Sequence, residues 1–322
     1  MQDFSVFPTY DIVKNGIKSL SKYKWPTYDK KYNTDQFIKN ITDKLFEHFN
    51  VLPDLLYIHD GVKPLSINLF RARSFGTFQD ISLISEYKCK PIQLTTEIQR
   101  CNFPLKPIFY CSNDAGTAIM EVIRHQPIDT EKKYLISKWR IINDFNIKVV
   151  PFLYSDLPAQ NYYKLLGVKA LSRIPDIFEQ KLTNSQIKGL KLYFNYLATI
   201  FTTENYSLSA SIAHRILYAN HNFRADLFLY PSVQTDQRSI NIAIHPNFVD
   251  VNMQLVRIYS LQVNSINYST GEFKVVIDKY AEIEENIIMW KPVMPDDEKY
   301  KESIKKDFGF GVEFNFSEKN MD

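Results

Sequence analysis

Glycine is scarce in this chain, with only 9 among 322 residues. Neither GxGxxG nor GxxxxGK[ST] occurs, so the phosphate-binding loops of Rossmann enzymes and P-loop NTPases are missing. The 6 histidines form no HExxH pattern or metal-ligand pairing, and no serine stands in a GxSxG motif. The sequence therefore disfavours dinucleotide-dependent redox enzymes, P-loop NTPases, metallohydrolases and serine hydrolases.

Cysteine and long apolar runs are equally sparse. Cys89, Cys101 and Cys111 are an odd number without a CxxC pair, which indicates reduced thiols and no zinc site. No window reaches the roughly 20 apolar residues that cross a bilayer, and the first residues lack a basic start followed by an apolar run. We therefore expect a cytoplasmic protein without a metal or a membrane partner.

The charge is close to balanced, at +3, and is spread along the sequence rather than gathered in basic blocks. A distributed charge gives little attraction to a phosphate backbone, so nucleic acid is an unlikely partner of this chain alone. The content of 45% hydrophobic and 23% charged residues is that of a globular protein with one large core or two modest ones.

Three regions follow from the pattern of elements. Residues 1–60 form an N-terminal helical unit, since Phe37, Ile38, Ile41 and Leu45 recur at helical spacing within residues 34–49. Residues 61–290 hold the main α+β domain, interrupted by a helical insert at about 160–220, and residues 291–322 read as a charged tail. Strands are expected at 65–73, 107–111, 133–141, 146–153, 227–233, 240–244 and within 254–277.

Four polar residues of three types, arginine, glutamate and serine, stand out against these elements. Arg71 and Arg73 share one face of the first expected strand, and Glu121 lies about two turns into a helix that directly follows a strand. Ser232 follows Pro231 at a strand end. An arginine suits a diphosphate, and a carboxylate stabilises a positively charged sugar, so the set favours a dinucleotide with a labile glycosidic bond, which points to NAD.

Each of these residues also has a plainer interpretation. Arg71 can pair with an acid such as Glu121 at the edge of the core, and a glutamate on a helix is usually only solvated. Tyr110 can stack on a nicotinamide or adenine ring or belong to the core, and Ser232 can meet a phosphate or cap a turn. No single residue decides between these alternatives.

The joint pattern resembles the RES domain family, named for its arginine, glutamate and serine. Over roughly residues 65–250 the similar segments occur in the family's order. They are Phe70-Arg71, Arg100-Cys101-Asn102, the run from Pro107 to Ser112 around Tyr110, the helix with Thr117-Ala118 and Glu121, and Tyr230-Pro231-Ser232.

This resemblance implies an ADP-ribosyltransferase-like α+β fold that consumes NAD as its substrate and needs no metal. It also implies a toxin of a toxin-antitoxin system whose antitoxin is an Xre-type protein. By the same resemblance Arg71, with Arg73 as a neighbouring alternative, and Ser232 contact NAD. Tyr110 then lines the nicotinamide pocket, and Glu121 is the catalytic glutamate, with Arg71 as the second catalytic residue.

The reaction itself stays open at this stage. A RES-type enzyme that breaks the nicotinamide-ribose bond can pass the ADP-ribose unit to water, to inorganic phosphate or to a protein side chain. The sequence departs from the family's Gly-Arg-x-Asn-x-x-Gly run, which here reads Gln99-Arg100-Cys101-Asn102-Phe103-Pro104-Leu105. Glycine permits close backbone approach to a ligand, so a catalytically inactive RES-like binding module is the alternative from another class.

Overall fold

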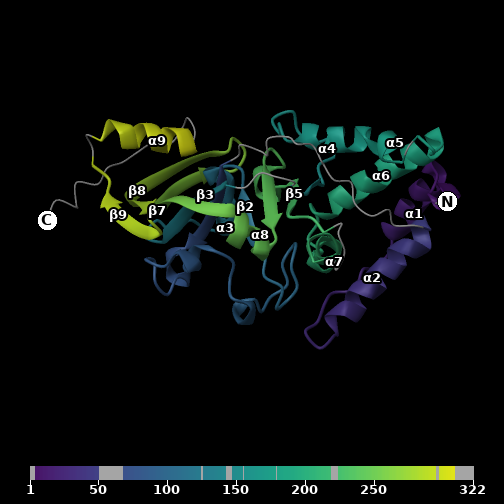
Figure 1. Ribbon diagram of the computed structural model, residues 1–322, viewed down its shortest axis with the longest axis horizontal. Coiled ribbons are helices and arrows are strands. Elements are labelled where there is room, and N and C mark those ends of the chain that lie inside the picture. Colours follow the sequence, from purple (N-terminus) through teal and green to yellow (C-terminus); the bar gives the residue numbers. More distant parts are fainter. Residues whose placement is uncertain are drawn as a thin grey trace.

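The computed structural model describes residues 4–50, 68–124, 126–142, 147–154, 156–178, 180–218, 224–294 and 297–308. Over these residues the chain has the predicted α+β fold, with helices set against a mixed sheet (Figure 1). The strands are β1 (Leu69–Ser74), β2 (Phe109–Ser112), β3 (Lys133–Ile141), β4 (Val149–Pro151), β5 (Leu227–Pro231), β6 (Ile240–Ile244), β7 (Met253–Asn267), β8 (Glu272–Glu284) and β9 (Ile287–Pro292).

The described strands form one sheet in the order β4-β5-β6-β2-β1-β3-β7-β8-β9, but its two halves are barely joined. β1 pairs with β3 along its whole length, and β2 pairs in the same way with β6. Between β1 and β2 the register holds a single pair, Phe70 with Ser112. The two strands therefore diverge beyond this pair, and the sheet is in effect two half-sheets that meet at one point.

Helices cover one face of the half-sheet that ends in β2 (Figure 1). They are α1 (Tyr10–Leu20), α2 (Thr34–Phe49), α4 (Lys164–Ser172), α5 (Ile174–Ile177), α6 (Asn184–Ile200) and α7 (Tyr206–Leu217). One hydrophobic core joins Val13 and Phe49 of the N-terminal helices to Leu190 of the predicted insert and Phe228 of β5. The helix within 34–49 is confirmed, and the predicted insert and N-terminal unit pack directly on each other.

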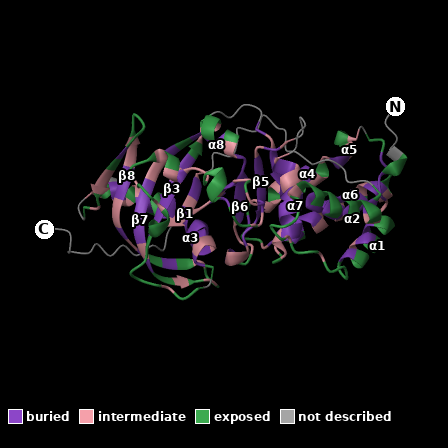
Figure 2. Cartoon of the chain, turned by 90° about the horizontal axis from the view of Figure 1, so that it is seen from below, coloured by how far each residue is buried: buried purple, intermediate pink, exposed green. Residues whose placement is uncertain are grey.

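The close approach of these two helical segments depends on Gly189 in α6. A methyl group added at this position would come within 2.7 Å of the Pro8 carbonyl oxygen, which is shorter than a van der Waals contact. The helix can therefore pass the chain that leads into α1 only because it has no side chain there. Figure 2 shows the buried residues that result, along α6, α7 and β5.

The other half-sheet is covered by α3 (Ala115–Ile123) and by α9 (Glu298–Phe308). α9 belongs to the segment that was predicted as a charged tail, and over its described residues this prediction is wrong. Tyr300, Ile304 and Phe308 recur every four residues and are buried against the sheet, so the described charged side chains other than Asp307 occupy the remaining faces of the helix. Asp307 is buried too, and accepts hydrogen bonds from Lys138 Nζ (2.5 Å) and Tyr259 Oη (2.6 Å).

The remaining elements follow the sequence prediction closely. β5 and β6 lie within the expected strands at 227–233 and 240–244 and pair antiparallel, and further strands occupy 69–74, 109–112, 133–141 and 149–151. The expected residues 65–67 lie outside the described residues. Among the described helices, none combines the length and the apolar content that a membrane span requires.

We predict that His245 makes the fold acid-sensitive. It begins α8 (Pro246–Asn252), where its Nδ1 accepts a hydrogen bond from the amide of Asn247 (3.2 Å), so the folded protein holds the imidazole neutral. Burial, and next the charge of Arg224, lowers the pKa of His245 to about 4. The unfolded chain therefore binds more protons between pH 6.5 and 4, and the free energy of unfolding falls as the pH falls through this window.

His245→Asn keeps a helix-capping oxygen but does not titrate. Between pH 7 and pH 4.5 the wild type should lose about 2 kcal/mol more unfolding free energy than this variant, measured by urea unfolding. Equal losses in the two proteins would show that His245 does not cause the acid sensitivity.

Candidate functional site

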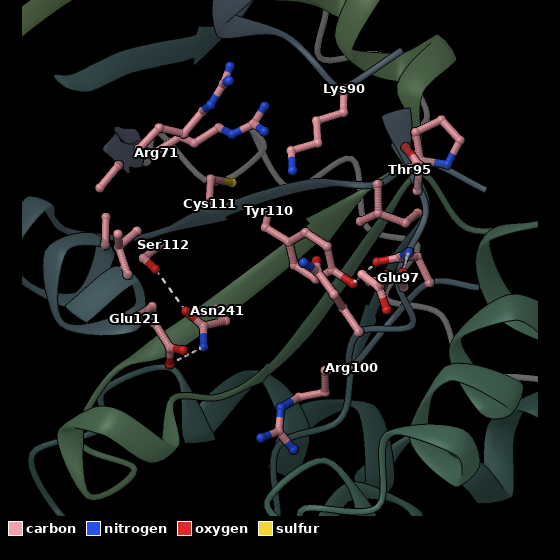
Figure 3. A pocket seen from close by; sticks show the side chains of 18 of the residues that line it. Arg71, Lys90, Thr95, Glu97, Arg100, Tyr110, Cys111, Ser112, Glu121 and Asn241 are labelled. Carbon is pink, nitrogen blue, oxygen red and sulfur yellow. Dashed lines mark hydrogen bonds between the residues drawn. The ribbon is translucent and has the colours of Figure 1, made fainter. Parts of the chain in front are cut away.

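A cleft of about 270 Å³ opens where β1 and β2 diverge. Its walls come from both strands, from α3 and from the segment that precedes β2, and they carry Arg71, Lys90, Arg100, Tyr110 and Glu121 (Figure 3). In Figure 3 Arg71 and Lys90 lie on one side of the cleft, Glu121 lies on another and Tyr110 stands between them. The fold thus brings together a tyrosine, a carboxylate and several cations from separate parts of the sequence.

Glu121 reaches the cleft because α3 begins at a fixed point. Asp114 caps the helix, accepting a hydrogen bond from the amide of Thr117 (2.7 Å). Two turns later the Glu121 Oε1 atom accepts hydrogen bonds from Ser232 Oγ (2.7 Å) and Asn241 Nδ2 (2.5 Å). Within the described residues no group donates to Oε2, so this oxygen is available to a ligand in the cleft.

Asn241 is a site residue that the sequence prediction missed. Its Oδ1 accepts a hydrogen bond from Ser112 Oγ (2.8 Å), which fixes the orientation of the amide and directs its Nδ2 toward Glu121 (Figure 3). The signal was present in the sequence, because Asn241 is the only polar residue of the strand Ile240–Ile244. An amide inside an apolar strand is buried, and it therefore needs a partner.

Ser232 occupies a different place from the one predicted. It is fully buried, with 0% of its surface exposed, and it does not line the cleft. Its hydroxyl lies behind Glu121 and donates to it. The structure therefore does not support direct contact between Ser232 and a dinucleotide; the serine orients the carboxylate instead.

Tyr110 combines a fixed hydroxyl with a ring on the cleft wall. The hydroxyl donates to Asn102 Oδ1 (2.8 Å) and accepts from the amide of Cys101 (2.9 Å), which ties β2 to the preceding loop. Burial raises the pKa of the Tyr110 phenol well above its usual value, so the group is neutral. The ring is therefore held in one orientation, as a stacking surface requires.

Arg71 and Arg73, which the sequence could not separate, differ in their free donors. Arg73 uses both terminal nitrogens, donating from Nη1 to the Glu86 carbonyl and from Nη2 to the Thr77 carbonyl (2.8 Å). Arg71 donates from Nη1 alone, to the carbonyls of Tyr87 (3.2 Å) and Lys88. In the described part of the chain its Nη2 and Nε donate to no group, and it makes no ion pair with Glu121.

Arg71 keeps its positive charge although burial disfavours it. Burial lowers the pKa of Arg71 to about 10, which leaves the guanidinium protonated at neutral pH. Its flat face lies 4.8 Å from the centre of the Phe109 ring, so that the ring restrains the side chain. The result is a cation fixed on the wall of the cleft whose Nη2 and Nε donate to no described group.

Arg100 repeats this arrangement elsewhere in the cleft. Its Nη1 donates to the carbonyls of Phe201 and Thr203, both at 2.6 Å, and its guanidinium lies over the Tyr206 ring at 5.0 Å. These partners belong to the junction between α6 and α7. The predicted helical insert is thereby joined to the loop that carries Arg100, and it supplies part of the cleft wall.

The family model described as RES domain matches residues 90–264, more than half of the chain. The chain belongs to the RES domain family. The match contains Arg100, Tyr110, Glu121 and Ser232 but begins after Arg71 and Arg73. No curated protein matches the chain. Within the described residues no group of three or more histidine, cysteine or acidic side chains is placed to hold a metal ion.

The backbone of this RES chain has a glycine-like conformation at one of the two positions where the family's glycine run is altered. Leu105, which stands where the family has its second glycine, has a φ of 61°, in the left-handed region that glycine adopts without strain. Its amide donates to the Thr95 carbonyl (2.7 Å), which closes the loop beside the cleft. Gln99, at the first altered position, does not have a positive φ and therefore needs no glycine.

We predict that Leu105→Gly stabilises the protein. A left-handed leucine costs about 1–2 kcal/mol, and the extra freedom of glycine in the unfolded chain offsets part of the gain, so the free energy of unfolding should rise by about 1 kcal/mol. Leu94→Gly is the matched control, because Leu94 is as exposed as Leu105 (57% against 58%) but does not have a positive φ. Urea unfolding should show the control destabilised; equal shifts would contradict a strained Leu105.

Proposed function

We propose that this RES chain consumes NAD by breaking the bond between nicotinamide and ribose. The observation that carries the proposal is Glu121, a carboxylate on the cleft wall whose Oε1 is fixed by Ser232 and Asn241 while its Oε2 accepts no hydrogen bond from a described residue. The same cleft also holds fixed arginines. A preorganised negative charge stabilises the positive charge that the ribose develops as this bond breaks. Membership of the RES domain family supports the same reaction class.

The chemistry balances without a metal or a redox partner. The electron pair of the C1′–N bond moves to the nicotinamide ring nitrogen, which neutralises its positive charge, and C1′ becomes oxocarbenium-like beside Glu121. An acceptor oxygen or nitrogen then bonds to C1′ and releases its proton. Water as acceptor gives a glycohydrolase, inorganic phosphate gives a phosphorylase, and a protein side chain gives an ADP-ribosyltransferase. We favour water or phosphate, with transfer to protein as the alternative.

We assign roles to the other cleft residues from the parts of their side chains that remain available to a ligand. The Tyr110 ring is the stacking surface for a planar ring of the substrate. Arg71 and Arg100 each keep Nη2 and Nε unengaged within the described residues, and guanidinium forks suit diphosphate oxygens. We propose that these two cations hold the phosphates of NAD. The engaged Arg73 serves to fix the neighbouring loop.

A protein partner fits the surroundings of the cleft. Leu94, on the cleft wall, and Leu105, in the loop beside it, are both more than half exposed. Membership of the RES domain family supports a protein partner, and these two apolar side chains at the rim of the cleft would be contacts for it. We therefore propose that the chain acts as the toxin of a toxin-antitoxin pair, whose Xre-type partner blocks the cleft.

The first test follows nicotinamide release from NAD by the purified protein, with and without phosphate. Glu121→Gln keeps the size of the side chain and removes its charge, and it should lower kcat by a factor of about 100 or more. Glu131→Gln changes an exposed glutamate outside the cleft and should leave the rate unchanged. A wild type that binds NAD but releases no nicotinamide would leave the binding-module alternative in place.

A second test separates the arginines. Arg71→Lys and Arg100→Lys remove the planar fork, and each should raise KM for NAD about tenfold or more. Arg73→Lys lies on the same strand face as Arg71, but its terminal nitrogens are already engaged, so KM should change less than about threefold. The assignment fails if Arg73→Lys raises KM as much as Arg71→Lys does in equally stable proteins.

A further inference from the structure

Gln234 is a cleft residue with an unused buried oxygen. It lies in the short 3-10 helix η5 (Val233–Thr235), two residues after Ser232, and its side chain lines the cleft. The Oε1 atom is buried and has no hydrogen-bond partner in the described part of the chain. Burying a carbonyl oxygen without a partner is unfavourable, and such groups are uncommon in folded proteins. The oxygen therefore needs a donor that the described residues do not supply.

The loop that holds Gln234 cannot easily relax to satisfy this oxygen. Asn161, which is fully buried, donates from Nδ2 to the carbonyl of Gln237 (2.7 Å). At the end of the loop the Ser239 hydroxyl bonds to the side chains of Asn113 (2.6 Å) and Asp114 (2.8 Å), which precede α3. The loop is thus fixed to the same helix that carries Glu121. These bonds fix the backbone that carries Gln234, while no hydrogen bond to a described residue holds its side-chain oxygen. A ligand donor can therefore engage Oε1 when the Gln234 side chain turns toward the cleft, with the loop itself unchanged.

The position of Gln234 indicates which part of a ligand it meets. The serine two residues before it donates to Glu121, and η5 packs against α3. The group opposite Gln234 is therefore close to the sugar that Glu121 is proposed to stabilise. A carbonyl oxygen accepts from a neutral N–H or O–H group, and it repels a carboxylate.

We propose that Gln234 Oε1 accepts a hydrogen bond from a neutral donor on the nicotinamide riboside half of the dinucleotide and so determines substrate specificity. The donor is either the carboxamide N–H or a ribose hydroxyl, which share this chemistry. The inference rests on the proposed NAD cleavage for its choice of ligand. Its physical basis is independent of the reaction: Gln234 lines the cleft, and its buried Oε1 has no hydrogen-bond partner among the described residues.

The test is a binding cycle in the Glu121→Gln protein, which retains an oxygen to accept from Ser232 and Asn241 but should not turn over. Calorimetry gives Kd for NAD, for its 3-acetylpyridine analogue, which lacks the carboxamide N–H, and for the analogue without the 2′-hydroxyl of the nicotinamide ribose. Gln234→Met removes the acceptor at nearly constant size. Gln160→Met, at an exposed glutamine outside the cleft, is the matched control.

Gln234→Met should weaken NAD binding about three- to tenfold, and Gln160→Met should not. In the parent protein the analogue that lacks the relevant donor should bind about ten- to a hundredfold more weakly than NAD, because it leaves Oε1 unpaired. In Gln234→Met the ratio of the Kd of this analogue to the Kd of NAD should fall to within about twofold. The melting temperature of Gln234→Met should equal or exceed that of its parent, since an unpartnered buried oxygen is removed. The analogue that shows the effect identifies the donor.

Ratios that are unchanged by Gln234→Met for both analogues would overturn the proposal. If the wild type releases nicotinamide while the ratios stay unchanged, NAD cleavage stands and the role of Gln234 fails. If the ratios change as expected but the wild type releases no nicotinamide, the role of Gln234 stands and the proposed reaction fails. A protein that does not bind NAD contradicts both.

Discussion

The constraint on which the site depends is the divergence of β1 and β2 after their single shared pair, Phe70 with Ser112. Each strand is fully paired on its outer side, so the gap between them is held open by two stable half-sheets. Beyond the shared pair, side chains of both strands line the cleft that opens between them. Arg71 on β1 and Tyr110 on β2 face the same space for this reason, although 38 residues separate them in the sequence.

A second layer of polar groups then gives the cleft its chemistry. Ser112 orients Asn241, and Asn241 and Ser232 together fix one oxygen of Glu121. The serine and the asparagine are buried, and their hydrogen bonds are directed at the carboxylate. A charge held in this way needs no reorganisation when positive charge develops nearby, and this is the main source of electrostatic catalysis.

The sequence predicted what local patterns determine. The strand-to-helix setting of Glu121, the shared face of Arg71 and Arg73, and the helix within 34–49 all follow from periodicity and capping, and the structure has them. Long-range contacts were not predictable in this way. The bond that places Ser232 behind Glu121 joins residues 111 positions apart, and the buried face of α9 was hidden by its many charges.

The central claim is that the diverging strands bind NAD with its nicotinamide riboside against Glu121. A crystal structure of the Glu121→Gln variant with NAD tests this claim most directly. The account predicts the ribose C1′ within about 4 Å of the residue 121 side chain, with the diphosphate at the guanidinium of Arg71 or Arg100. NAD bound outside the cleft, or bound with its nicotinamide riboside turned away from residue 121, would contradict it.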